Sequence, residues 1–410
     1  MFFSICVPTR NRQSQCLRLI NGYRNISMPD GVEIVVCDNS DQPELLSEQI
    51  NELFEGSIPN WLNFTFKPAQ ESVRSMRQNW QKALDQASGE WITFIGDDDY
   101  ADPLISNLLF RLRDHDKDYD YLGWGHLKFQ WPGVSDNEVT VRVNLSNKLK
   151  RFPIETAFDD LLACKGDRPT SLLSPYHGAI HRSLIERVSS DFGNDSQFFK
   201  HSNVDYFSGW LAATRSKKNA FSLRQLSVAG ASVGSNSYLT RKGGGSIEAS
   251  KIAIKEQSND HQGGENAGIL DSIKDRGDIS SLSEFFYLLP LDFFKLVTDR
   301  NEYEGNWVEN TIQRFETELL GIVEKETFQI TKEHMDQFLN KTFGIKTQTQ
   351  WSGPTPEMSL ARGFHNGHLF ILNSAFGCND SAEFYSHINQ LLRPIQHLGN
   401  EVKLQTRGAQ

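Results

Sequence analysis

Short apolar runs alternate with segments of helical periodicity through the first hundred residues, and this alternation constrains the fold more than any other feature. Strand-like and helix-like segments follow one another at residues 3–7, 13–23, 32–37, 44–54, 73–87 and 91–95. Strands that alternate with helices predict an α/β fold with a Rossmann-like, mainly parallel sheet flanked by helices. Such sheets bind ligands beyond the carboxyl ends of their strands, so we expect the functional residues there.

The length of the chain predicts more than one unit. Its 410 residues exceed the roughly 250 to 300 at which a single core stops growing. We expect an α/β domain over residues 1–240, a flexible Gly-rich connection over 241–268 and a mostly helical domain of unknown role over 269–410. Apolar residues between Trp307 and Val323 recur at three- and four-residue steps, which is typical of an amphipathic helix. This C-terminal region is the candidate surface for a homo-oligomer.

Composition excludes several classes of protein. The 42 Lys and Arg residues are outnumbered by 52 Asp and Glu residues and form only short clusters, which argues against a nucleic-acid partner. Five scattered cysteines predict neither a disulfide framework nor a zinc site. The first residues lack the features of a signal peptide, and the most apolar stretch, 285–297, is too short to span a bilayer. We expect a cytoplasmic protein without a transmembrane segment, with peripheral association at the inner face of the membrane left open.

Three consecutive aspartates, Asp97, Asp98 and Asp99, directly follow the predicted strand at 91–95. Adjacent carboxylates repel one another, and a divalent cation would relieve that repulsion. Mg²⁺ and Mn²⁺ prefer oxygen ligands and commonly bind one or two carboxylates together with substrate phosphate oxygens. The alternative interpretation is an acidic, solvated loop that caps the next helix.

Four segments carry a resemblance to a known family: VPTRNR at 7–12, VCDNSD at 36–41, the run from SMRQNW to GDDD at 75–99, and SPYHGAIHRSLIERV at 174–188. Together they resemble an inverting family 2 glycosyltransferase of the GT-A fold, over about residues 1–215. The resemblance implies an enzyme that transfers a sugar from a nucleoside-diphosphate sugar, UDP-linked, to a glycan or lipid-linked glycan acceptor in surface polysaccharide synthesis. No resemblance covers residues 250–410.

The resemblance also implies a set of donor-binding residues. These are Pro8, Thr9, Arg10, Asp38, Arg74, Arg77, Asn79, Asp97 and Asp98. The carboxylate of Asp38 suits the N3–H group of uracil because a carboxylate only accepts hydrogen bonds. Alternatively, Asp38 and Asn39 only form an Asx-turn after the strand. Arg74 and Arg77 would reach the diphosphate, unless they are solvated on an exposed helix face.

The expected chemistry needs a cation and a base. By resemblance, Asp99 coordinates Mn²⁺ or Mg²⁺ and Asp97 assists, so that the cation neutralises the leaving nucleoside diphosphate. Asp205 matches the position of the base that takes the proton from the acceptor hydroxyl. The match departs from the family pattern, a Glu-Asp pair, because the residues that precede Asp205 are Asn203 and Val204, and neither is acidic.

Several alternatives stay open on the acceptor side. Asp205 can instead be an early-helix carboxylate favoured by the helix dipole, with other aspartates as the base, namely Asp160, Asp191 and Asp195. Tyr176 and His177 match the floor between donor and acceptor. Arg241 and Lys242 form a candidate lid or belong to a linker.

Two further alternatives concern the histidines and the whole chain. His365 and His368 have helical spacing without an evident third ligand, so we expect a packing or surface role for them. A sugar-1-phosphate nucleotidyltransferase would need a Gly-rich loop with a lysine near the start, and the segment VPTRNR does not supply it. A catalytically inactive sugar-nucleotide-binding or scaffolding protein is the alternative from a different class.

Overall fold

The structure is a computed structural model that describes part of the chain. The described residues are 1–70, 75–134, 139–151, 154, 173–192, 196–201, 203–233, 289, 293, 296–297, 307–320, 325–353, 362–392 and 394–395. Two compact units divide the chain. The first contains Met1–Phe152, Leu173–Ser235 and Leu360–Gln410, and the second contains Pro153–Leu172 and Asn236–Ser359.

This division differs from the one expected, because the last fifty residues cluster with the α/β unit instead of the helical region. Strands β11 (Gly363–His365) and β12 (His368–Leu372) form a hairpin that pairs with β7 (Thr140–Asn144). The 3-10 helix η2 (Asn373–Phe376) and helix α15 (Ser381–Gln390) follow, and α15 packs against α1 and β10. The second unit is therefore inserted into the chain of the first.

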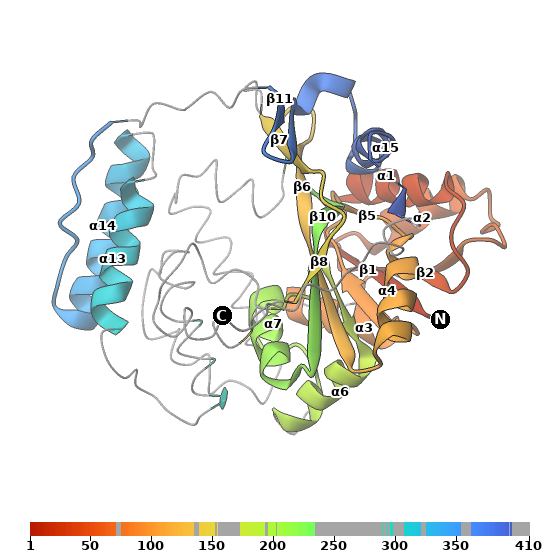
Figure 1. Cartoon of the computed structure of the whole chain (residues 1–410), viewed down its shortest axis with the longest axis horizontal. Coiled ribbons are helices and arrows are strands. Elements are labelled where there is room, and N and C mark those ends of the chain that lie inside the picture. Colours follow the sequence, from red (N-terminus) through yellow and green to blue (C-terminus); the bar gives the residue numbers. More distant parts are fainter. Residues whose placement is uncertain are drawn as a thin grey trace. The chain divides into compact units, whose positions relative to one another are not determined.

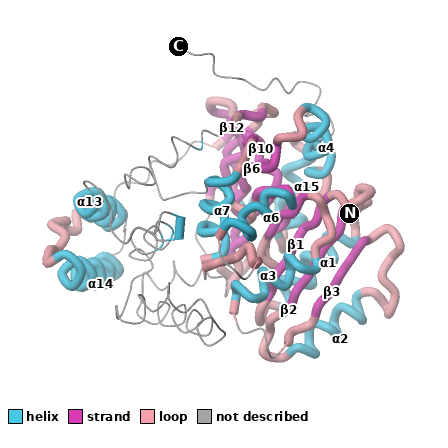
Figure 2. Tube along the Cα trace, turned by 90° about the horizontal axis from the view of Figure 1, so that it is seen from below, coloured by secondary structure: helices cyan, strands magenta, loops and turns pink. Residues whose placement is uncertain are grey.

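The first half of the main sheet is parallel, as the alternation predicts. Its strands are β1 (Phe3–Thr9), β2 (Val32–Asp38), β3 (Asn63–Lys67) and β4 (Trp91–Phe94), in the order β3-β2-β1-β4. Their pairings with one another are all parallel, and Figure 2 shows β1, β2 and β3 side by side. The strand β3 did not figure among the predicted strands; its side chains are only half-buried, which leaves a weak apolar pattern.

The second half of the sheet is mixed and continues from β4 in the order β9-β6-β10-β5. Its strands are β5 (Tyr100–Ala101), β6 (Tyr119–Gln130), β9 (Gly178–His181) and β10 (Lys218–Ala231), and β8 (Leu149–Lys150) pairs with β10. The long strands β6 and β10 run parallel, whereas β9 is antiparallel to both its neighbours. The α/β class with a mainly parallel central sheet and surrounding helices is confirmed.

Helices cover the main sheet on both faces (Figure 1). They are α1 (Gln13–Arg24), α2 (Pro43–Leu53), α3 (Met76–Gln86), α4 (Ile105–His115), α6 (Arg182–Asp191) and α7 (Val204–Arg215). Alternate residues of β1 point to opposite faces of the sheet. Phe3, Ile5 and Val7 belong to one core with residues of α1, α2, α4 and α15. Cys6 contacts α3 on the other face. Both faces of β1, β2 and β4 are therefore buried, which explains their continuous apolar runs.

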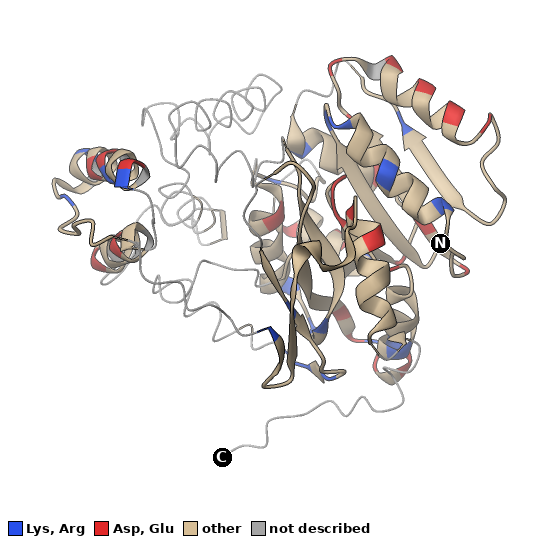
Figure 3. Cartoon of the chain, turned by 90° about the horizontal axis from the view of Figure 1, so that it is seen from above, with Lys and Arg blue, Asp and Glu red and all other residues tan. Residues whose placement is uncertain are grey.

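The second unit contains two described helices, α13 (Trp307–Leu320) and α14 (Lys325–Phe343). A small core that includes Phe315, Met335 and Leu339 holds them together, as the amphipathic pattern predicts. In the first unit, Figure 3 shows acidic positions along helices at the surface, and Glu44, Glu48 and Glu52 lie exposed on α2. None of the described helices is both long and apolar enough to cross a bilayer.

Candidate functional site

The ends of the parallel strands carry the polar groups of the candidate site. Thr9 and Asp38 face each other at the last register position of β1 and β2. The buried side chain of Asn79, in α3, ties these ends together. Its amide nitrogen donates to the carbonyl oxygens of Thr9 at 3.2 Å and of Cys37 at 3.0 Å. Asn79, predicted as a donor-binding residue, thus uses its amide nitrogen to hold the two strand ends.

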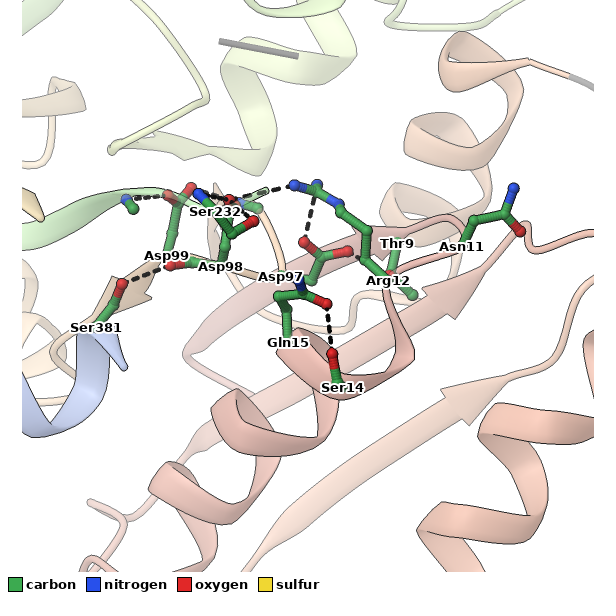
Figure 4. Close-up of polar contacts among 12 residues, drawn as sticks. Thr9, Asn11, Arg12, Ser14, Gln15, Asp97, Asp98, Asp99, Ser232 and Ser381 are labelled. Atoms are coloured by element: carbon green, nitrogen blue, oxygen red, sulfur yellow. Dashed lines mark hydrogen bonds and ion pairs between the residues drawn. The ribbon is translucent and has the colours of Figure 1, made fainter. Parts of the chain in front are cut away.

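The aspartates after β4 are buried, and Arg12 supplies positive charge beside them (Figure 4). Guanidinium nitrogens of Arg12 lie 2.8 Å from Asp97 Oδ1 and 3.3 Å from Asp98 Oδ2. The hydroxyl of Thr9 donates to Asp97 Oδ2. Asp98 Oδ2 also accepts hydrogen bonds from the backbone N–H of Ser232 at 3.1 Å and from its hydroxyl at 2.7 Å. The cluster is therefore a charge-paired, buried site instead of a solvated acidic loop.

Burial dominates the electrostatics of the first two aspartates. It raises the pKa of both Asp97 and Asp98, and the guanidinium of Arg12 offsets only part of this effect. Burial alone would lower the pKa of Arg12, but the carboxylates outweigh it and raise that pKa above its ordinary value. Arg12 is therefore charged at neutral pH, and its single guanidinium group faces two buried carboxyl groups.

Asp99 is anchored by its own loop and by groups from two other segments of the chain. Its Oδ1 accepts a hydrogen bond from the N–H of Gly230 at 2.8 Å. Its Oδ2 accepts from the N–H of Gly96 at 2.6 Å and from the hydroxyl of Tyr176 at 2.5 Å, and His177 Nε2 lies 3.4 Å away. Burial opposes ionisation, but His177 and these donors outweigh it and lower the pKa of Asp99. Asp99 is thus ionised, with both of its oxygens engaged.

The segment that carries Tyr176 and His177 is fixed between β10 and α7. His177 has a φ of 55°, a conformation rare for residues other than glycine, and its Nδ1 lies 2.8 Å from Ser227 Oγ. Helix α7 approaches this segment closely at Gly209, where a Cβ atom would lie 1.9 Å from the carbonyl oxygen of Leu173. The predicted residues Tyr176 and His177 therefore lie beside the aspartates on one side and α7 on the other.

Asp205 lies in the first turn of α7 and is half-buried. Its carboxylate interacts electrostatically with His177 and Tyr176, the two residues that also contact Asp99. Burial raises the pKa of Asp205 to about 6, although N–H groups at the start of the helix oppose that shift. A carboxyl group that ionises near pH 6 can accept a proton at neutral pH.

The side chain of Asp38 is used on one oxygen only. Its Oδ1 accepts hydrogen bonds from the N–H of Ser40 at 2.9 Å and from its hydroxyl at 2.5 Å, which is the Asx-turn expected as the alternative. Its Oδ2 is buried and accepts no hydrogen bond from the part of the chain that the structure describes. Burial raises the pKa of Asp38. The turn and a free acceptor oxygen therefore coexist in one residue.

Other predicted donor residues contact the protein itself. Pro8 is buried within β1, and Arg10 pairs with the exposed Asp41 at 3.4 Å. An Nη atom of Arg77 donates to Gln197 Oε1 at 2.6 Å. Arg10 and Arg77, both predicted to bind the donor, thus contact other protein side chains in this structure.

The remaining candidates are engaged elsewhere or lie outside the described residues. Asp191, one of the alternative bases, pairs with Arg215 at 2.5 Å. Outside the described residues are Arg74, Arg241, Lys242, Asp160, Asp195 and the expected connection at 241–268.

The helical spacing assigned to His365 and His368 is wrong. The two residues lie opposite each other in the β11–β12 hairpin, where His365 pairs with His368. The turn contains Asn366 and Gly367, both with positive φ, and this Asn-Gly pair favours a hairpin over a helix. His368 Nε2 lies 2.7 Å from an Arg142 nitrogen, in keeping with the expected packing or surface role.

Sequence reasoning missed three residues of the site. Arg12 belongs to the segment VPTRNR, but the resemblance implied Arg10 from this segment as a donor-binding residue. The chain turns at Asn11, whose φ is 54°, and Arg12 then faces the aspartates. The signal was the need for a cation beside three buried carboxylates. Ser232 and Ser381 contact Asp98 from far along the chain, and no local pattern identifies them.

Strand-end carboxylates on a parallel half-sheet are typical of nucleotide-binding α/β domains. Residues 4–133 match the family described as glycosyl transferase family 2, which confirms the resemblance for this stretch, less than half of the chain. The chain is also similar to GalNAc(5)-diNAcBac-PP-undecaprenol beta-1,3-glucosyltransferase of Campylobacter jejuni, with 34% identity over 97 residues. That alignment covers 23% of this chain and 29% of the relative.

Two solved structures show weaker similarity to the chain. The TarS 1-349 structure from S. aureus in complex with UDP-GlcNAc has 16% identity and a TM-score of 0.40, covering 82% of this chain and 89% of that one. The mannosyltransferase PcManGT of Pyrobaculum calidifontis, in complex with GDP-Man and Mn²⁺, has 14% identity and a TM-score of 0.36, covering 82% and 84%.

The residues present fit a divalent cation at Asp97. Its Oδ1 contacts Arg12 as an ion pair but accepts no aligned hydrogen bond from the described residues, so a lone pair remains open. Within the described ranges, no group of three or more His, Cys, Asp or Glu side chains converges on one point. A full protein cage is not needed, because Mg²⁺ and Mn²⁺ bind through one or two carboxylates together with phosphate oxygens and water.

Proposed function

We propose that this chain is a metal-dependent inverting glycosyltransferase. It transfers a sugar from a nucleoside-diphosphate sugar, UDP-linked, to a hydroxyl group of a glycan or lipid-linked glycan in the synthesis of a surface polysaccharide. One observation carries the proposal: Tyr176 and His177 contact Asp99 of the buried aspartate cluster, and the same two residues interact electrostatically with the half-buried carboxyl of Asp205, whose pKa is about 6. Sugar transfer requires a centre that stabilises the charge on the leaving diphosphate, and a nearby group that accepts the proton of the acceptor hydroxyl.

The nucleotide is assigned to the ends of β1 and β2. The open oxygen Oδ2 of Asp38 accepts the N3–H of uracil, while Oδ1 stays in its turn with Ser40. Thr9, opposite Asp38, links this position to the aspartate cluster, because its hydroxyl donates a hydrogen bond to Asp97. The uracil ring and the aspartates are therefore assigned to neighbouring strand ends.

The diphosphate is assigned to the aspartates and Arg12. A Mn²⁺ or Mg²⁺ ion, when bound, supplies Lewis-acid stabilisation of the charge on the leaving nucleoside diphosphate. Asp97 would hold that ion through Oδ1, beside its ion pair with Arg12, whereas Asp99, the other expected ligand, would have to give up a protein donor. The partly exposed guanidinium of Arg12 is placed to bind diphosphate oxygens in addition.

Asp205 is assigned as the base. The acceptor hydroxyl oxygen forms a bond to the anomeric carbon as the bond from that carbon to the diphosphate oxygen breaks, and the hydroxyl proton passes to Asp205. Attack from the face opposite the leaving group inverts the anomeric configuration. Tyr176 and His177 lie between the two centres, so they orient the reacting sugar.

The test is a transfer assay with a panel of UDP- and GDP-linked sugars, glycan acceptors and Mn²⁺. We expect release of nucleoside diphosphate that depends on Mn²⁺, and a product whose anomeric configuration, followed by NMR, is inverted. Asp97→Asn should abolish the release. Binding of the donor without any turnover would favour the inactive binding protein instead, for which Asn203 and Val204 ahead of Asp205 are the supporting observation.

A further inference from the structure

Helix α15 reaches the aspartate loop from almost three hundred residues further along the chain. The hydroxyl of Ser381, the first residue of α15, donates to the backbone carbonyl oxygen of Asp98 (Figure 4). The indole N–H of Trp131 lies 3.0 Å from the same oxygen and 3.2 Å from Ser381 Oγ. Ser381 is fully buried, so this contact replaces water at the carbonyl.

The same carbonyl is enclosed by β10. At Gly230, a Cβ atom would lie 1.9 Å from the carbonyl oxygen of Asp98 and 2.8 Å from Ser381 Oγ, while the N–H of Gly230 binds Asp99. Three elements therefore meet at one peptide group of the loop. Since this peptide joins Asp98 to Asp99, its orientation sets the directions in which the two side chains leave the backbone.

Helix α15 is itself firmly held. Asp380 caps its first turn by accepting from the N–H of Glu383. Asn389 Oδ1 accepts from Arg224 at 2.6 Å. The ring centroid of Tyr385 lies 5.2 Å from that of Tyr100, the residue directly after the aspartates. Phe384 packs in the main core. A rigid helix with contacts on both sides of the loop can fix the loop against the mutual repulsion of its carboxylates.

We propose that Ser381, at the start of α15, is a positioning residue for the diphosphate-binding aspartates. This inference rests on the proposed function, because it concerns the geometry of that donor site. The C-terminal segment of the chain then completes the site that the N-terminal strands begin. Ser381 acts through the Asp98 peptide and does not itself contact the donor.

The experiment is isothermal titration of UDP with Mn²⁺ into the full chain and its variants. Ser381→Ala should weaken UDP binding about tenfold, the equivalent of one lost buried hydrogen bond. Ser381→Thr, which keeps the hydroxyl, should restore it. Ser386→Ala, on the exposed face of α15, is the matched control and should bind like wild type. Trp131→Phe removes the second donor and should weaken binding in the same direction, should Ser381→Ala fail to fold.

The outcomes separate the two claims. Wild-type protein that binds no UDP overturns the proposed function, and this inference with it. Wild-type binding that persists unchanged in folded Ser381→Ala and in Trp131→Phe overturns the positioning role alone. A lower melting temperature of Ser381→Ala at unchanged UDP affinity would show a purely structural contact and also contradict the proposal.

Discussion

At the scale of single residues, the site balances three buried carboxylates against few cations. Arg12 contacts Asp97 and Asp98, whereas Asp99 depends on neutral donors and on His177. The polar residues at the strand ends could be predicted, because each one directly follows an apolar run in the sequence. The pairing with Arg12 was not, since it follows from the turn at Asn11.

Replacing Arg12 tests this balance. Arg12→Gln leaves Asp97 and Asp98 buried without their cation, which should cost on the order of 3 kcal/mol of unfolding free energy. We expect a lower melting temperature, and a larger rise on addition of Mn²⁺ than in wild type, because the added ion restores positive charge. Arg10→Gln is the control, since Arg10 pairs with the exposed Asp41. Equal melting temperatures of the two variants would contradict the role of Arg12.

The raised pKa of Asp205 predicts a pH profile. With a pKa of about 6, the rate of transfer should rise about tenfold per pH unit below pH 6 and level off above it, because only the ionised carboxylate accepts a proton. Asp205→Asn should lower kcat by roughly a hundredfold or more while leaving donor binding intact. Steady-state rates between pH 4.5 and 8, with donor titrations on the variant, check both. Full activity of Asp205→Asn would move the base elsewhere.

The same shift has a consequence for stability. The folded-state pKa of Asp205 lies above the value near 4 of an unfolded chain, so ionisation opposes folding. Its contribution is present below about pH 4 and is lost as the pH rises toward 6. Thermal melts of wild type and Asp205→Asn should therefore diverge in favour of the variant over this window.

At the scale of elements, the sequence predicted the parallel half of the sheet better than the rest. Strands buried on both faces leave continuous apolar runs, and β1, β2 and β4 were predicted for that reason. The half-buried β3 and the hairpin β11–β12 carry weaker patterns. The joining of Asp98 to Ser232 and Ser381 depends on tertiary packing, so no local periodicity reports it.

Gly230 provides a test of how closely β10 must approach the aspartate loop. A Cβ atom there would overlap the carbonyl oxygen of Asp98, so Gly230→Ala should lower the unfolding free energy by about 1 to 3 kcal/mol and weaken donor binding. Gly125→Ala is the control, because its Cβ atom would meet only Gln225 Cγ at 3.5 Å. Denaturant melts and UDP titrations compare the two. A wild-type result for Gly230→Ala would mean that β10 and the loop can separate freely.

At the scale of the whole molecule, the α/β unit is built from the beginning, the middle and the end of the chain. The expected boundary at residue 240 followed composition, which registers Gly-rich stretches but not the return of the chain. Phe384 and Ile388 of α15 are fully buried in the main core. The C-terminal segment is therefore part of the unit that carries the candidate site.

This arrangement predicts that replacing two phenylalanines of the C-terminal segment by alanine has unequal effects on the unfolding free energy. Phe384→Ala should lower the unfolding free energy by about 3 to 5 kcal/mol, because it leaves a cavity in the main core. Phe364→Ala, at a side chain that is 72% exposed, should change it little. Denaturant melts of the full chain measure both. Similar stabilities of the two variants would show that α15 does not belong to the core.

The central claim, a metal-assisted site for a nucleoside-diphosphate sugar, is tested most directly by thermal shift. Wild type and Asp97→Asn are melted with a panel of nucleotides and nucleotide sugars, each with and without Mn²⁺. A ligand at a hundred times its Kd stabilises the folded state by about 2.7 kcal/mol. We predict that UDP and UDP-sugars raise the melting temperature of wild type when Mn²⁺ is present, and that Asp97→Asn loses this response. No stabilisation of wild type by any nucleotide, or an effect that is indifferent to Mn²⁺, would contradict the account.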